Sequence, residues 1–337
     1  MKKALVLLVI FAMALFITGC GEQTSTGKTF IGGTEGLKTT FLAGNPPDTT
    51  TDGKSGGFSI VVKLENVGEN DIKAGDGYVQ IWGLDTGIYG ATDPDFKQLF
   101  RTDNGFNPSL RGAVKNFDGT VLNGGVTTVT FANLAYQPII QGDLQQKIWA
   151  NICYNYATKM AAQICIKSTT EQALNNKDIC SVEGEKNPQN SGGPIQITSL
   201  KESYAGNGKM GITIILTHQG SGDNFFKDDK ATPECNDVES NSDRGKVWLG
   251  FKDIQVGGKY VAIECTGLEG SGARDVYKGG FTRMYKDGTG KETTTVYCTA
   301  NTGVINNVVE VPVEAIVRYT YLQHISQDLT IRHVSQG

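Results

Sequence analysis

Large apolar residues alternate with smaller or polar residues in two stretches of the chain that resemble each other. Residues 57–64 read GFSIVVKL and residues 209–216 read KMGITIIL, at a constant offset of 152 residues, and each stretch leads into a glycine. An alternation with a period of two is typical of a strand that buries one face. The two stretches therefore predict two copies of one β-module.

A second match lies toward the end of each copy. Residues 150–156 and 315–321 share an apolar start and a Tyr-x-Tyr end, and residues 164–166 match 329–331 at the same offset of 165. In both copies seven residues separate the Tyr-x-Tyr strand from a short apolar strand. We therefore expect each copy to close with an antiparallel hairpin, a pattern that suits a two-sheet sandwich.

The first twenty residues have the features of a lipoprotein leader. Two lysines near the start precede an apolar run over 5–17, and residues 17–20 read Ile-Thr-Gly-Cys, a lipobox. We expect 1–19 to be a signal peptide and Cys20 to be lipidated, so that the mature protein is anchored to the outer face of the cytoplasmic membrane or to the cell surface. Cleavage without lipidation is the alternative. A spanning helix is disfavoured because the run is shorter than the ~20 residues that one needs.

The composition supports an exported β-protein and excludes one class of partner. The chain of 337 residues has 39% hydrophobic residues, 43 glycines and 20% charged residues, a profile typical of globular β-rich proteins. A mature length above 300 residues favours two domains. The net charge is only −4 and the basic residues are scattered, so we expect no nucleic-acid partner.

Six cysteines remain of the seven after Cys20, and in an exported chain they predict disulfides. None is spaced as CxxC and the chain has only three histidines, which makes a zinc site improbable on composition. We expect Cys153 to pair with Cys165 across the first hairpin and Cys265 to pair with Cys298 between neighbouring strands. By elimination Cys180 would then meet Cys235. Free or differently paired thiols remain the alternative for that last pair.

The domain limits follow from the turn chemistry of residues 186–194, Lys-Asn-Pro-Gln-Asn-Ser-Gly-Gly-Pro, which predicts a linker. An aromatic-rich stretch over 84–126 predicts a packed excursion or a binding surface inside the first domain. The predicted organisation is, in order, a signal peptide at 1–19, a tether at 20–31, one β-domain at 32–185, the linker at 186–194, and a second β-domain at 195–337.

One motif resembles a catalytic sequence of known enzymes. Residues 190–194 resemble the sequence around the nucleophile of trypsin-like proteases, but those enzymes place their histidine upstream, and here the first histidine is His218. The histidines are expected to be surface or packing groups. No carboxylate pair, nucleophile elbow or dinucleotide fingerprint is recognisable, so we expect no catalysis, no catalytic residue and no cofactor site.

An acidic stretch over 228–243 offers oxygen ligands of the kind that calcium prefers. It lacks the glycine-anchored spacing of a calcium loop and is interrupted by basic residues, so a solvated loop is favoured and calcium is the alternative. The acidic residues are Asp228, Asp229, Glu234, Asp237, Glu239 and Asp243.

Residues 32–37 (GGTEGL), 41–48 (FLAGNPPD) and 58–68 (FSIVVKLENVG) resemble the opening of uncharacterised exported, membrane-anchored Ig-like β-sandwich proteins of small-genome archaea. The resemblance implies two tandem Ig-like antiparallel β-sandwich domains after the signal peptide, and no assigned activity. It does not extend to the 84–126 insertion.

These observations predict a lipid-anchored protein of the cell surface with a structural, adhesive or envelope-associated role. Its expected partners are the membrane, through the lipid, and envelope proteins or glycans. The alternative is a ligand-binding lipoprotein for glycan or peptide that uses the 84–126 loop and the aromatic residues Trp248, Phe251, Tyr277 and Phe281. A hydrolase is the third and least supported hypothesis.

Overall fold

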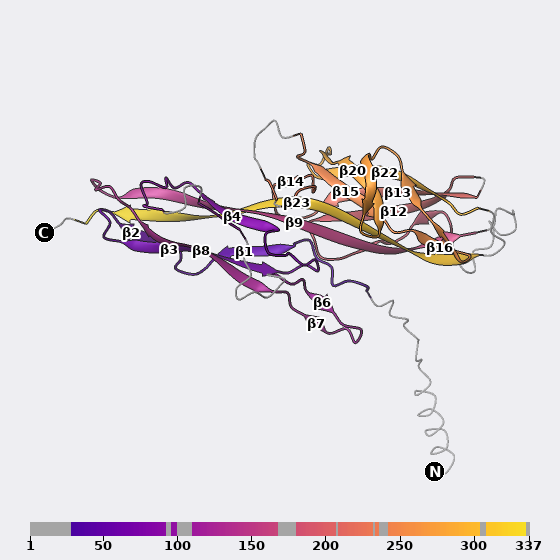
Figure 1. The fold of residues 1–337 in the computed structure, drawn as a ribbon, viewed down its shortest axis with the longest axis horizontal. Helices are drawn as coiled ribbons and strands as arrows, with labels where there is room; N and C mark the ends of the chain where they lie inside the picture. Colours follow the sequence, from indigo (N-terminus) through magenta and orange to yellow (C-terminus); the bar gives the residue numbers. More distant parts are fainter. Residues whose placement is uncertain are drawn as a thin grey trace, which may run out of the picture.

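The computed structural model describes residues 28–91, 96–99, 110–167, 180–206, 208–231, 233–235, 242–303 and 308–334. Their regular structure consists of strands, which confirms the predicted all-β class (Figure 1). No helix in these ranges has the length and apolar character to cross a membrane. The predicted signal peptide and the lipidation site Cys20 lie outside the described residues.

Two long strands run through the whole molecule. β9 (Leu144–Ile166) and β23 (Val309–Arg332) pair antiparallel, from Val309 opposite Ile166 to Ile331 opposite Leu144. At ~3.3 Å per residue, the 23 residues of β9 span about 75 Å. The predicted hairpins are therefore wrong. Residues 157–163 contain no glycine or proline to make a turn, and they continue β9 because β23 offers them a partner.

A first sandwich, called lobe 1, surrounds one half of this long pair. One layer is a three-stranded antiparallel sheet. It packs over a second layer, formed by the N-terminal part of β9 and the C-terminal part of β23, and further strands extend this second layer at both edges. The small sheet consists of β1 (Leu37–Phe41), β3 (Gly57–Asn66) and β8 (Val126–Ala135), and the edge strands are β2 (Thr49–Thr51), β4 (Gly77–Trp82) and β5 (Lys97–Leu99).

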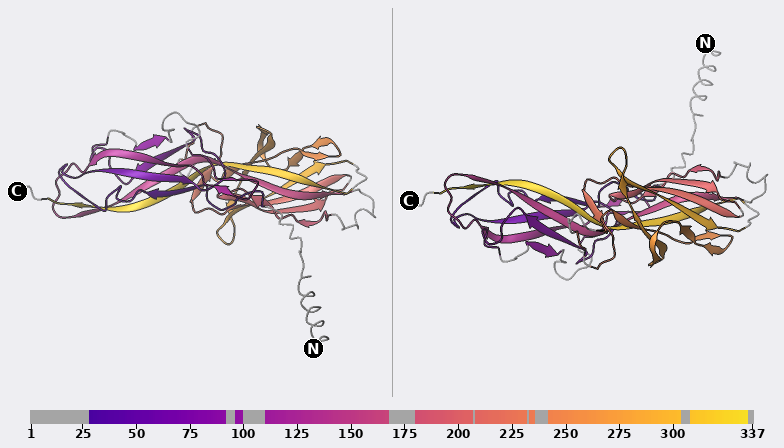
Figure 2. Two further views of the ribbon diagram at one scale, coloured as in Figure 1. Left: turned by 90° about the horizontal axis from the view of Figure 1, so that it is seen from below. Right: turned by 90° about the horizontal axis from the view of Figure 1, so that it is seen from above.

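A second sandwich, called lobe 2, surrounds the other half. Its smaller sheet consists of β10 (Gly184–Glu185), β12 (Ile195–Tyr204), β13 (Lys209–His218), β18 (Ile263–Cys265), β21 (Tyr285–Lys286) and β22 (Glu292–Asn301). The long pair is extended there by β11 (Gln189–Asn190), β14 (Asn224–Phe226), β15 (Lys246–Phe251), β19 (Glu269–Arg274) and β20 (Tyr277–Arg283). Figure 2 shows the two lobes side by side along an elongated body, with the long strands passing through both.

The two lobes are copies of one module that exchange strand halves. β3 and β13 hold the matched stretches 57–64 and 209–216, and each is the strand between two partners in its smaller sheet, as the repeat predicts. Asn155 and Thr320, which are equivalent in the repeat, face each other in the long pair. A pseudo-twofold axis thus passes between them. The predicted domain limits follow the two sequence copies. In the structure, however, lobe 1 also contains the C-terminal half of β23, and lobe 2 also contains the C-terminal half of β9.

Four tyrosines pack around this axis. Tyr154, Tyr156, Tyr319 and Tyr321 are buried, and their rings meet at tilted or edge-to-face angles with centroids 5.8 to 6.2 Å apart. Such aromatic pairs stabilise a core beyond the area they bury. The Tyr-x-Tyr motif of each copy therefore forms the junction between the lobes.

The same backbone contact anchors this junction in both copies. The N–H of Asn70 donates to the Tyr156 hydroxyl at 3.3 Å, and the N–H of Gly222, 152 residues further on, donates to the Tyr321 hydroxyl at 2.7 Å. A Cβ at Gly68 would overlap the Tyr156 hydroxyl, so this position requires glycine. The repeat thus fixes how the smaller sheets meet the long strands.

Three disulfides join the six remaining cysteines. The predicted pair Cys265–Cys298 is confirmed, because the two residues face each other on β18 and β22. The predicted pairs Cys153–Cys165 and Cys180–Cys235 are wrong: Cys153 bonds to Cys235, and Cys165 bonds to Cys180. Cys153 and Cys165 lie on the same continuous strand β9, roughly 40 Å apart at ~3.3 Å per residue, which prevents a bond.

The predicted linker is packed against the fold. Residues 189–190 form β11, which pairs with β9, and Ser191 is buried with its Oγ accepting the N–H of Lys159 at 2.9 Å. The aromatic residues of the 84–126 insertion differ in their burial. Tyr89 and Phe96 are core residues, Phe117 is fully exposed, and Phe100 and Phe106 lie outside the described residues.

Candidate functional site

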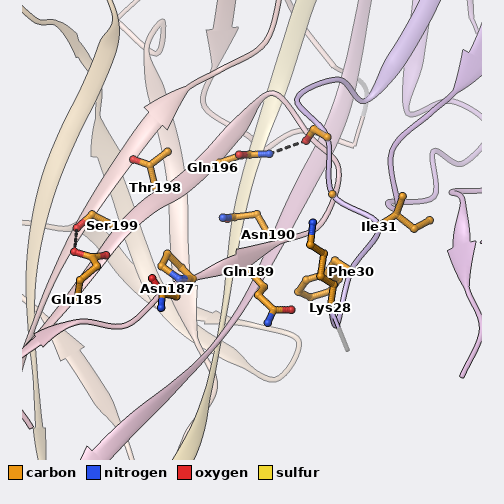
Figure 3. Close-up of a pocket in the computed structure, with 13 residues that line it drawn as sticks. Lys28, Phe30, Ile31, Glu185, Asn187, Gln189, Asn190, Gln196, Thr198 and Ser199 are labelled. Atoms are coloured by element: carbon orange, nitrogen blue, oxygen red, sulfur yellow. Dashed lines mark hydrogen bonds between the residues drawn. The ribbon is translucent and has the colours of Figure 1, made fainter. Parts of the chain in front are cut away.

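Two concave surfaces lie where the chain enters lobe 1 and crosses onto lobe 2. Two adjoining hollows of about 760 and 750 Å³ flank residues 28–33 and share Phe30, Glu185, Asn187 and Gln189. We call them together the amide groove. Figure 3 shows the first hollow, whose lining side chains come from the entering segment, from the 185–190 segment and from β12.

A half-buried carboxylate holds the entering segment in place. Glu69 accepts hydrogen bonds from the N–H groups of Ile31 and Gly32 at 3.0 Å each, and from Gly192 at 2.8 Å. The Gln196 amide donates to the Gly33 carbonyl at 2.6 Å, which is visible as a dashed line in Figure 3. One wall of the groove is therefore a backbone segment that lobes 1 and 2 fix jointly.

The opposite wall is built from side chains that form hydrogen bonds with backbone groups of β12. Asn190 accepts from the Ile197 N–H at 3.0 Å and donates to its carbonyl at 2.8 Å, which closes the 190–197 turn. Glu185 accepts from the Ser199 hydroxyl at 2.7 Å and from the Leu200 N–H at 2.8 Å. These bonds orient β10 and β12, and the groove floor between them is polar.

The first hollow has the chemistry to bind a polar ligand. Its lining combines amide side chains, the hydroxyls of Thr198 and Ser199, the charged residues Lys28 and Glu185 and one aromatic ring, Phe30. The Asn187 amide forms no hydrogen bond with another described residue, so its two donors and its acceptor oxygen are available to a ligand. Polar groups that converge around an apolar surface are typical of small-ligand sites.

The second hollow lies on the outer face of the long strands and carries charge. It is bordered by Lys159, Glu310, Pro312 and Tyr277. Lys252 and Glu314 form an ion pair across it at 2.5 Å. This pair raises the pKa of Lys252, chiefly because Glu314 accepts its hydrogen bond. The second hollow therefore has more charged residues on its lining than the first, where the charged residues are Lys28 and Glu185.

One buried carboxyl lies close to the groove but outside it. Glu202 is fully buried, accepts the Cys165 N–H at 2.9 Å and forms an ion pair with Lys186 at 3.0 Å. Burial raises its pKa to about 7 in spite of these two partners. The cavity next to Cys165 measures about 20 Å³, space for a single water molecule.

The histidine with the most developed hydrogen bonding is His218. Its Nδ1 lies 2.9 Å from Glu292 Oε2 and its Nε2 lies 2.8 Å from the Tyr321 hydroxyl. The same hydroxyl accepts the Gly222 N–H at 2.7 Å, so the ring connects Glu292 to the hydroxyl that anchors Gly222. His218 also packs against Phe225, so its role here is to position Tyr321 at the lobe junction.

The acidic stretch does not form a metal cluster in the part that the structure describes. Asp228 contacts Arg274, Asp229 forms an ion pair with Lys227 at 2.8 Å, and Glu234 forms one with Lys230. Among the described residues no group of three or more His, Cys, Asp or Glu side chains could hold a metal ion. Asp237 and Glu239 lie outside these residues.

The aromatic residues expected to bind a ligand are core residues. Trp248, Phe251, Tyr277 and Phe281 are buried. The Arg274 guanidinium lies 5.3 Å from the Trp248 ring and 5.1 Å from the Phe281 ring, a cation–π arrangement that closes this surface. That expectation is therefore wrong for Trp248, Phe251 and Phe281, whereas Tyr277 borders the second hollow. Sequence reasoning missed the groove because its residues come from three short polar segments without a shared pattern.

Comparison with known proteins gives weak likeness only. No protein-family model matches the chain, and neither does any curated protein. Among solved structures, a serine-rich repeat adhesion glycoprotein from Streptococcus agalactiae matches at a TM-score of 0.20 and 10% identity, over 89% of this chain and 97% of that one. The partial N-terminal region of an enterococcal surface protein matches at 0.14 and 10%, over 94% and 98%. Scores this low establish no shared fold.

Proposed function

We propose that this protein is a lipid-anchored module of the cell surface with a structural, adhesive or envelope-associated role, and that it performs no catalysis. The observation that carries the proposal is the exchange of β9 and β23 between the lobes. The long antiparallel ladder of β9 and β23, to which the 23 residues of β9 contribute, joins the two sandwiches into one elongated body. The Cys153–Cys235 disulfide ties β9 to a loop of lobe 2, and the other two disulfides lie within lobe 2. Such a body suits mechanical spacing and display better than a hinged catalytic cleft.

The disulfides support an oxidising compartment. Cys153–Cys235 links β9 to a loop of lobe 2, and Cys165–Cys180 closes a short loop at the far end of β9. Disulfides persist in exported proteins and are rare in the reducing cytosol. The lipobox ending at Cys20 supports the same location independently.

The direct test is the accessibility of the protein on intact cells that produce it. We expect a membrane-impermeant amine reagent to label exposed lysines such as Lys209 and Lys259 before lysis, and the protein to fractionate with membranes. Labelling that requires lysis would overturn the surface location.

The amide groove favours a second candidate, which is recognition of a neutral glycan or an extended peptide. This keeps the ligand-binding alternative and moves it from the aromatic insertion to Phe30 and Asn187. Screening the full chain on a glycan array, followed by thermal shift with any hit, tests it. A saturable hit that Asn187→Ala and Phe30→Ala abolish, and that the distant surface variant Tyr260→Ala retains, supports recognition. Binding that survives both groove variants excludes this groove.

A further inference from the structure

A small hairpin stands away from lobe 1 with an apolar tip. β6 (Val114–Lys115) and β7 (Val121–Leu122) form it, and Figure 1 shows it projecting from the side of the body. Phe117 at its turn is 106% exposed and Leu122 is 58% exposed, while Val114 and Val121 are also exposed. A cluster of this kind on a water-soluble surface indicates an interaction site.

The hairpin holds Phe117 outward in a defined conformation. The Asn116 N–H donates to the Thr120 carbonyl at 2.9 Å, and the Gly119 N–H donates to the Asn116 carbonyl at 3.0 Å. Gly119 has a φ of 85°, which a glycine adopts without strain. The turn is thus closed by its own backbone, and the apolar tip is a built feature of the fold.

The base of the hairpin is joined to the start of the described chain. The Lys115 ammonium donates to the Lys28 carbonyl at 2.7 Å, and the N–H of Ala113 donates to the Gly68 carbonyl at 2.7 Å. Only residues 21–27 separate Lys28 from Cys20. Even fully extended at ~3.5 Å per residue, this stretch places the base of the hairpin within about 28 Å of the lipidated residue.

We propose that the β6–β7 hairpin is a second membrane contact, which inserts Phe117 and Leu122 into the boundary between headgroups and acyl chains beside the lipid anchor. This inference rests on the proposed lipidation of Cys20. Transfer of aromatic and aliphatic side chains to that boundary lowers the free energy, and the Lys115 ammonium beside the turn would meet the lipid phosphates. The anchor supplies the proximity, and the hairpin fixes which side of the elongated body faces the bilayer.

The test uses the full lipidated chain reconstituted in vesicles of phosphatidylcholine and phosphatidylglycerol that carry brominated acyl chains. Phe117→Trp introduces a reporter at the tip, and Tyr260→Trp is the matched control, because Tyr260 is a 75% exposed aromatic on the hairpin of β16 (Ile254–Val256) and β17 (Lys259–Val261) in lobe 2. Each spectrum is read as the difference from the parent protein. We expect a blue shift and quenching for the residue 117 reporter alone.

A second measurement is the fraction of lipidated protein that stays bound to the vesicles. Phe117→Ser combined with Leu122→Ser is expected to lower retention of the lipidated protein by about tenfold or more, whereas Tyr260→Ser leaves it unchanged. Equal quenching at residues 117 and 260, or unchanged retention, overturns the inference while the proposed anchor stands. Protection of residue 117 on cells but not in vesicles assigns the hairpin to a protein partner and also overturns it. Mass spectrometry that finds Cys20 without lipid overturns both proposals.

Discussion

The pseudo-twofold junction offers a pair of matched variants, Tyr321→Phe and Tyr156→Phe. The two hydroxyls occupy equivalent places, but their hydrogen bonds differ. Tyr321 lies 2.7 Å from the Gly222 N–H and 2.8 Å from His218 Nε2. Tyr156 lies 3.3 Å from the Asn70 N–H and 3.2 Å from the Gly192 carbonyl. The first pair is near ideal length and the second is long.

The expected free energies follow from these distances. Tyr321→Phe leaves the buried Gly222 N–H and His218 Nε2 without this partner, while His218 Nδ1 keeps Glu292. The change costs about 3 kcal/mol, since each unsatisfied buried group costs ~1–3 kcal/mol. Tyr156→Phe removes two long bonds and costs about 1 kcal/mol. Because both changes delete the same atom from a buried ring, differences in packing largely cancel.

The assay is urea unfolding at pH 7 with the disulfides intact, followed by near-ultraviolet circular dichroism. The account predicts a lower midpoint for Tyr321→Phe than for Tyr156→Phe, with similar slopes. Equal midpoints, or a lower midpoint for Tyr156→Phe, would refute the assignment of these networks as the unequal anchors of the two lobes.

Two further predictions concern stability. In the chain-entropy treatment, replacing Cys153 and Cys235 together by alanine lowers the unfolding free energy by about 4.5 kcal/mol, and replacing Cys165 and Cys180 lowers it by about 3 kcal/mol. The difference arises because the sequence separations are 82 and 15, and the longer loop restricts the unfolded chain more. The reverse order of stability in chemical unfolding would contradict this prediction. Glu202 has a folded pKa of about 7, above its ordinary 4.5. The folded state therefore holds this proton more tightly than the unfolded state, so the contribution is complete below pH 4.5 and is lost as the pH rises through 7. The unfolding free energy should fall by about 3 kcal/mol over that interval, and an unchanged slope in Glu202→Gln would count against this carboxyl as the cause.

The sequence predicts the strand class and the repeat because both depend on local alternation. The stretches at 57–64 and 209–216 bury one face each, and they take equivalent places in β3 and β13. The pair Cys265–Cys298 was accessible for the same reason, since each cysteine follows an alternating stretch, and Cys265 at the end of β18 faces Cys298 within β22.

The strand exchange was not accessible from the pattern. Residues 157–163 read ATKMAAQ, which has no alternation, so they resemble a connection between two short strands. Their strand conformation depends on β23, which lies more than 140 residues away along the chain, as the pairing of Ala157 with Arg318 illustrates. The wrong hairpin in turn gave the wrong disulfides, because the position of Cys165 was inferred from it.

The candidate site was hidden for a related reason. Residues 187–190 have the composition of a linker. They form one wall of a groove only because the entering segment 28–33 and β12 lie against them. Conversely, Trp248 and Phe281 are residue types that are common on binding surfaces. They are buried here because β15 pairs with β20 and the Arg274 guanidinium lies against both rings.

Mass spectrometry of the protein purified from its native membrane, with and without reduction, tests the central claim most directly. The account predicts a mature chain that begins at an acylated Cys20 and carries six oxidised thiols in the pairs Cys153–Cys235, Cys165–Cys180 and Cys265–Cys298. An unmodified chain with free thiols would contradict both the surface location and the disulfide-joined double sandwich.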